Sequence, residues 1–115
     1  MNSVSLIGNL ATDVQRKEVG EHKLLATFLL AVDRIGGEQA DFVPIVAWEK
    51  QAELCDRFLS KGKRVAIAGR LRSRSWEDEG RRRTVVDVVA HQVEFLSPPN
   101  ARAAEADIPF EAAMA

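Results

Sequence analysis

Apolar and polar residues alternate between Arg64 and Trp76, which is the pattern of a β-strand with one face on a hydrophobic core. The inward series is Val65, Ile67, Gly69 and Leu71. The outward series is Arg70, Arg72, Arg74 and Trp76. Because side chains two residues apart share a face of a strand, the outward series places positive charge beside an aromatic ring. Such a surface suits a nucleic-acid backbone with unstacked bases, whereas the alternative is a solvated basic edge that discourages strand pairing.

The same patterns predict an all-β chain with one short helix. The expected strands cover residues 4–10, 15–19, 23–33, 41–48, 64–76, 81–91 and 93–96. Helical spacing predicts the helix over residues 50–61, capped by Gly62. The unbroken apolar run at 24–32 predicts a strand covered on both faces, and Gly8 predicts a bulge or a close backbone approach. A turn at Asp78-Glu79-Gly80 gives a long hairpin. Apart from the less regular piece at 15–19 and the short last strand at 93–96, five strands with one helix after the third indicate a small Greek-key barrel.

The chain is expected to consist of one folded domain, residues 1–97, and a short flexible acidic tail, residues 98–115. A length of 115 residues with 46% hydrophobic content is enough for one compact core. Ser97-Pro98-Pro99-Asn100 ends the folded part. The tail is rich in alanine and acidic residues, and we expect it to be too poor in large apolar groups to fold alone.

The formal net charge of -1 conceals an uneven distribution of charge. Basic residues outnumber acidic ones between Lys61 and Arg83, whereas acidic residues predominate in the tail. A basic groove and an acidic tail can act separately although they cancel in the total. Cys55 is the single cysteine, and no leader or apolar stretch of ~20 residues is present. We therefore expect an intracellular protein with no membrane contact.

No pattern of residues indicates catalysis. His22 and His91 lie far apart, without Cys, Asp or Glu at ligand spacing, so we expect no metal and no cofactor. No Ser/His/Asp group, phosphate-binding loop or pair of carboxylates with a raised pKa can be assembled. We expect that the chain is not an enzyme, and a small hydrolase on the same scaffold remains the alternative.

The aromatic residues divide into candidate contacts and candidate core. Trp76 shares its face with arginines that cannot all be buried unpaired, which predicts an exposed ring. Phe42 and Trp48 share a face with Val46, and they fit either a binding surface or a core. The phenylalanines expected in the core are Phe28, Phe58 and Phe95.

Several separated motifs resemble those of the bacterial single-stranded-DNA-binding protein family. The motifs are Met1–Leu10, Asp41–Trp48, the helix through Lys61-Gly62, and Gly69–Trp76. They follow the family order and spacing from Met1 to about Leu96. The resemblance implies an oligonucleotide/oligosaccharide-binding (OB) fold, usually a homotetramer, that coats single-stranded DNA without sequence preference during replication, repair and recombination. It also implies that the protein is cytoplasmic and nucleoid-associated, and that Phe42, Trp48 and Trp76 stack on bases.

Basic residues complete the expected nucleic-acid interface. They are Arg34, Arg70, Arg72, Arg74, Arg81, Arg82 and Arg83. The tail carries a second family motif, Asp107, Ile108, Pro109 and Phe110. The resemblance implies that this motif binds replication and repair proteins, although here it is followed by five residues, so Phe110 lacks the terminal carboxylate.

The sequence departs from the family pattern at two further places. Ile35-Gly36-Gly37 stands where a further aromatic is common, and Pro44 stands where a polar or basic residue is common. Fewer stacking residues leave open an alternative, namely a primosomal or RNA-binding relative that acts mainly as a replication-restart assembly factor. For the homotetramer, we expect Val4 and Leu6 to point outward and to offer apolar area.

Overall fold

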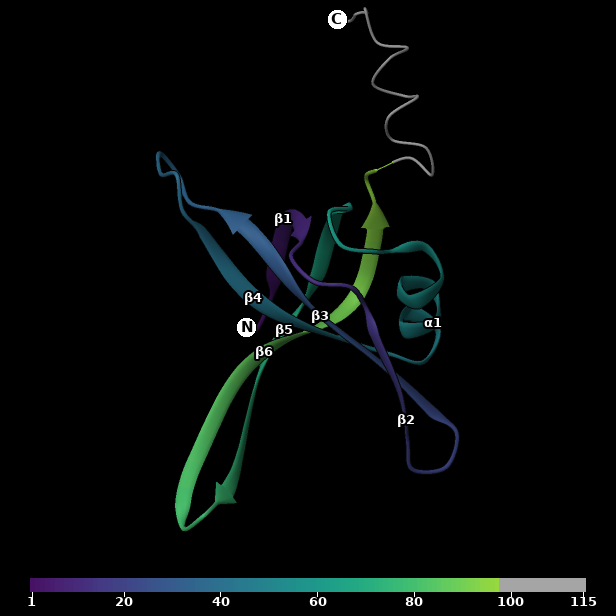
Figure 1. Ribbon diagram of the computed structural model, residues 1–115, viewed down its shortest axis with the longest axis vertical. Coiled ribbons are helices and arrows are strands. Elements are labelled where there is room, and N and C mark those ends of the chain that lie inside the picture. Colours follow the sequence, from purple (N-terminus) through teal and green to yellow (C-terminus); the bar gives the residue numbers. More distant parts are fainter. Residues whose placement is uncertain (98–115) are drawn as a thin grey trace, which may run out of the picture.

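The computed structural model describes residues 1–97, in which six strands and one helix form a strongly curved sheet with protruding hairpins (Figure 1). The strands are β1 (Val4–Leu10), β2 (Gln15–Val19), β3 (Lys23–Asp33), β4 (Ala40–Trp48), β5 (Arg64–Asp78) and β6 (Arg81–Phe95). The helix is α1 (Glu49–Phe58). The order of strands in the sheet is β1-β5-β6-β4-β3-β2. The tail predicted at residues 98–115 lies outside the described residues.

The sheet closes into a ring because β1 pairs with two strands. Residues Val4–Asn9 of β1 pair antiparallel with β5, and Leu10 pairs with Leu30 of β3. β4 and β6 complete the ring in parallel, with Ile45 opposite Val88. Since β1 and β2 both pair with β3, they count as one interrupted strand. The predicted five-stranded barrel of the OB type, with one helix and a long hairpin, is confirmed.

Two glycines allow neighbouring strands to approach closely. A Cβ atom on Gly8 would meet the carbonyl oxygen of Ala31 in β3, and a Cβ atom on Gly69 would meet that of Val89 in β6. A side chain at either position would have to displace backbone. The close approach predicted at Gly8 is confirmed.

The apolar run of β3 supplies the core on one face only. The buried residues of β3 are Ala26, Phe28 and Leu30. The alternate residues, which are half-buried, are Leu25, Thr27, Leu29 and Ala31. The prediction that both faces of this strand are covered is therefore wrong, because the second face lines a concave surface.

β5 and β6 form one long hairpin that extends away from the barrel (Figure 1). Within the predicted turn, Glu79 and Gly80 have positive φ values of 52° and 79°, which match the right-handed twist of the strands. β6 is continuous, although the sequence predicted a break after His91. His91 is the extra residue of a β-bulge, because Gln92 and Ala90 on either side of it pair with the consecutive Ala68 and Gly69. The bulge shifts the alternation of apolar residues by one position, which in the sequence resembles the end of a strand.

α1 covers one end of the barrel. Ala52 and Cys55 are fully buried, and the helix ends at Phe58, earlier than the predicted 61. Phe58 and Phe95 were predicted to be core, but they are 52% and 39% exposed and lie with their ring centroids 5.6 Å apart. Each stands at the last position of its element, where the core has ended. Among the described residues, no helix is long and apolar enough to cross a membrane.

Candidate nucleic-acid interface

Two adjoining hollows form a concave surface between β2, β3, β4 and the β5–β6 hairpin. Their volumes are ≈ 350 and ≈ 370 Å³. Thr27, Val46 and Arg74 line both hollows, so the two form one continuous groove. The groove is defined by Thr12, Gln15, Val19, Leu25, Thr27, Leu29, Pro44, Val46, Trp48, Arg72, Arg74 and Asp87.

Strand pairing makes the floor of the groove largely apolar. Leu25 lies opposite Trp48 and Thr27 lies opposite Val46, so these four side chains share one face of the β3–β4 pair. Gln15 of β2 pairs with Thr27 and extends the same face to the next strand. The floor therefore offers apolar area to a flat ring, with few polar groups that could read the edges of bases.

The three predicted stacking residues lie at different depths. Trp48 is half-buried and lines the groove where β4 meets α1. Phe42 belongs to the same face of β4 but is 62% exposed. Trp76 is 43% exposed on the β5–β6 hairpin, as predicted. None of the three belongs to the buried core, so the core interpretation of Phe42 and Trp48 is wrong.

Arg72 and Arg74 reach the groove from β5 and share one carboxylate, that of Asp87. Arg72 Nε donates to Asp87 Oδ1 and Arg72 Nη2 donates to Asp87 Oδ2, both at 3.1 Å. Arg74 Nε donates to Asp87 Oδ2 at 3.1 Å, and Arg74 Cζ lies 6.0 Å from the centroid of the Trp76 ring. Arg74 thus connects the groove to an exposed aromatic ring.

Asp87 is a residue of the groove that the sequence analysis missed. It lies directly opposite Arg72 in the hairpin. The available signal was the predicted turn, because counting outward from it places these two residues in register. The strand β2 was predicted, but its contribution to the groove was missed, since Gln15 and Val19 acquire their place there only by pairing with β3.

Arg34 and Arg70 do not line the groove. Arg34 Nε donates to Asp41 Oδ1 at 2.8 Å, and Arg34 Nη1 donates to Gln39 Oε1 at 3.3 Å, which holds this side chain on the β3–β4 hairpin. Arg70 is exposed on β5, opposite Val89. Among residues 1–97 Arg70 takes part in none of the ion pairs. The guanidinium of Arg70 is therefore available to solvent and ligands.

Two of the three arginines at the tip of the β5–β6 hairpin stand opposite acidic residues, and the third stands opposite Trp76. The cross-strand pairs are Trp76 with Arg83, Glu77 with Arg82, and Asp78 with Arg81. Arg83 Nε also lies 3.0 Å from Asp78 Oδ2. One of the three arginines is therefore neutralised by an ion pair, and Arg81 and Arg82 face carboxylates across the hairpin.

The remaining titratable groups of the described residues provide no catalytic site. Burial raises the pKa of the Cys55 thiol to about 11, so the reactive thiolate is scarce at neutral pH. Residues 1–97 contain no group of His, Cys, Asp and Glu arranged to hold a metal ion. The tail motif Asp107–Phe110 lies outside the described part of the chain.

Known proteins resemble this chain over nearly all of its folded part. The profile of the Single-strand binding protein family matches residues 1–96. The Single-stranded DNA-binding protein of Clostridium tetani is 47% identical over 102 residues, which cover 84% of this chain and 70% of the relative. Single-stranded DNA-binding protein 3 of Clostridium acetobutylicum is 45% identical over 102 residues, with 84% and 71% covered. The Single-stranded DNA-binding protein of Staphylococcus aureus is 36% identical over 114 residues, with 94% and 73% covered. The chain therefore belongs to the single-strand binding protein family, as its motifs predicted.

Proposed function

We propose that the chain binds and protects single-stranded DNA, without preference for base sequence, during replication, repair and recombination. The groove is the observation that carries this proposal, since an apolar floor lies between Trp48 and the guanidinium groups of Arg72 and Arg74. Such a surface can stack bases and contact phosphates while offering little to distinguish one base from another. Membership of the single-strand binding protein family supports the same function and confirms that the chain is not an enzyme.

The DNA strand would lie along the groove, with aromatic rings as its stacking stations. Phe42 and Trp48 mark one wall on β4, and Trp76 marks the other on the hairpin. In OB-fold proteins that bind single strands, stacking is worth about 1–3 kcal/mol per base. Every base has a face that can stack, so this contribution does not depend on sequence.

The arginines would supply the contacts to phosphates. Arg70, Arg72 and Arg74 lie along one strand and can follow a phosphate backbone. Arg34 and the tip arginines Arg81, Arg82 and Arg83 extend the same interface at the two hairpins. Their local acidic partners compete with phosphate, so we expect them to contribute less than the groove arginines.

A fluorescence titration tests the proposal, because Trp48 and Trp76 are the only tryptophans of the chain. Poly-deoxythymidine should quench their emission strongly and saturably, whereas double-stranded DNA of equal length should not. Poly-uridine tests the alternative, since a protein that prefers RNA must read the 2′-hydroxyl. Tighter binding of poly-uridine would favour the primosomal or RNA-binding alternative, and absence of binding to either polymer would refute the proposal.

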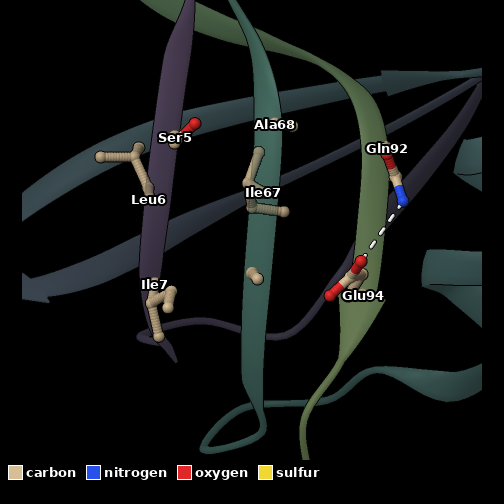
Figure 2. A pocket seen from close by; sticks show the side chains of 8 residues that line it. Ser5, Leu6, Ile7, Ile67, Ala68, Gln92 and Glu94 are labelled. Atoms are coloured by element: carbon tan, nitrogen blue, oxygen red, sulfur yellow. Dashed lines mark hydrogen bonds between the residues drawn. The ribbon is translucent and has the colours of Figure 1, made fainter.

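We also propose that the chain forms a homotetramer through the outer face of β1, β5 and β6, shown in Figure 2. This face contains a shallow hollow of ≈ 290 Å³ over Ala66 and Ala68, with Ile7 at its side. Within the described residues, Val4–Gly8 of β1 has a strand partner on only one edge. A second copy could cover both the free edge and the apolar face.

Oligomerisation can be tested by light scattering, which should give a mass near four chains. Ile7 is 53% exposed on this face, so Ile7→Glu should reduce the mass. Ile35 is 105% exposed at the turn between β3 and β4, so Ile35→Glu is the matched control and should keep the tetramer. Val4 and Leu6, which were predicted to face outward, instead pack against the core. A wild-type monomer at micromolar concentration would exclude the tetramer.

The tail motif Asp107, Ile108, Pro109 and Phe110 is proposed to recruit replication and repair proteins to DNA at the nucleoid. Apolar residues flanked by acidic ones can enter an apolar pocket with a basic rim. Binding of a replication-restart helicase to the full chain and to Phe110→Ala would test this, with Met114→Ala as control. Equal binding of all three proteins would show that the motif recruits nothing.

A further inference from the structure

Asp87 is the one charged residue that is buried among residues 1–97, with 1% of its surface exposed. It lies on β6 opposite Arg72 of β5. Val85 and Val89, two positions away on either side, belong to the same face of β6 and are apolar. A carboxylate at this depth is costly unless it is paired, and its partners are the two arginines of the groove.

The hydrogen bonds to Asp87 occupy only some of the donors of the two arginines. Arg72 uses Nε and Nη2, and Arg74 uses Nε, all at 3.1 Å. Because a guanidinium carries five N–H donors, both arginines retain free donors. The Arg74 side chain is 51% exposed and that of Arg72 is 24% exposed, and both line the groove. The free donors are thus available to a ligand in the groove, with the two Nε atoms fixed.

The net charge of Arg72, Arg74 and Asp87 together is smaller than the two arginines alone would give. Two guanidinium groups and one carboxylate give a single net positive charge. One net charge matches one phosphate of a DNA strand, whereas two free arginines would attract two.

We propose that Asp87 is the positioning residue for the groove arginines: it fixes Arg72 and Arg74 so that together they bind one phosphate of the strand. This inference rests on the proposed function and adds the arrangement by which the groove holds the backbone. Guanidinium groups that are already held in place lose little conformational freedom when they bind a phosphate. The affinity for that phosphate therefore depends on geometry more than on charge. If Asp87 had a purely structural role and only joined β5 to β6, its replacement by Asn would lower stability but leave the affinity extrapolated to 1 M salt unchanged.

The experiment measures the affinity for a short oligo-deoxythymidine over a series of salt concentrations. Asp87→Asn keeps the size of the side chain but raises the net charge of the group by one. Its log–log slope should become steeper by about 0.7, the value for one more phosphate neutralised on a single strand. The affinity extrapolated to 1 M salt should fall roughly tenfold, because the hydrogen-bonding geometry is lost.

A charge-matched variant separates positioning from charge. Arg74→Gln combined with Asp87→Asn restores one net positive charge, so its slope should equal that of the wild type while its affinity is lower at every salt concentration. Arg72→Lys serves if the Asp87 variants do not fold, as checked by thermal melting. It keeps all charges but removes the planar fork, so it should weaken binding severalfold with an unchanged slope.

Two results would overturn the proposal. One is a slope for Asp87→Asn equal to that of the wild type, and the other is wild-type affinity in Arg72→Lys at all salt concentrations. Failure of the wild type to bind the oligonucleotide would instead refute the proposed function itself, so the two failures can be distinguished.

Discussion

Replacing Trp76 with alanine should weaken binding to single-stranded DNA by roughly tenfold or more and leave the fold nearly as stable. Stacking of one base contributes about 1–3 kcal/mol, which corresponds to roughly 5- to 150-fold in affinity. The ring contributes less to folding, since 43% of it is exposed. Its contacts are Arg74, with Cζ at 6.0 Å from the ring centroid, and the opposite Arg83. Each such contact is worth at most about 1 kcal/mol on an exposed hairpin.

Anisotropy of a labelled oligo-deoxythymidine is the suitable assay, because it does not depend on tryptophan emission. Val86→Ala is the matched control, since Val86 is 53% exposed on the same hairpin but on the face opposite to Trp76. The control should bind like the wild type, and both variants should melt within a few degrees of it. The reasoning fails if the two variants lose affinity equally, or if Trp76→Ala melts so early that the ring must belong to the core.

Three further predictions concern other parts of the molecule. Phe42→Ala, at a position 62% exposed, should also weaken DNA binding about tenfold without changing the melting temperature, as measured by anisotropy and calorimetry. Gly69→Ala should lower the free energy of unfolding by about 1–3 kcal/mol in urea titrations, because its Cβ would meet the Val89 carbonyl, whereas Gly37→Ala, with its nearest contact at 3.4 Å, should be nearly neutral. Burial raises the pKa of Cys55 from 9.0 to about 11, so the folded state binds more protons between these values. The free energy of unfolding should therefore fall as pH rises from about 9 to 11, by up to about 2 kcal/mol more than in Cys55→Ala, and urea titrations at several pH values would measure it.

Strands and helices were predicted well wherever the spacing of apolar residues and the positions of turn-forming residues indicated the same element. The hairpin turn, the first strand and the helix were found because each combines a clear period with a glycine or a change of spacing. The interruption at His91 was misread because a bulge shifts the period without ending the strand. A prediction that assumes strict alternation along a strand cannot detect a single inserted residue.

The exposed residues of the candidate site could be predicted from the sequence, whereas the residues that pair with them could not. Trp76 and the outward arginines could be placed on one face from their spacing alone. The apolar second face of β3 could not be recognised as a groove, because burial inside a protein and a floor for bases require the same residue types. Asp87 required the register of two strands, which is set by pairing rather than by local pattern.

Ion pairs within this chain, whose net charge is -1, limit how much of the binding to a polyanion charge alone can supply. Arg34 is paired with Asp41, Arg83 with Asp78, and the two groove arginines share Asp87. If every arginine of the proposed interface neutralised its own phosphate, the log–log salt slope for one barrel would be about -5. The ion pairs leave Arg70, Arg81, Arg82 and one net charge at Asp87 as the main contributors, which gives a slope of about -2.8. Stacking must then supply much of the affinity, and a measured slope steeper than about -4 would show that DNA separates these ion pairs.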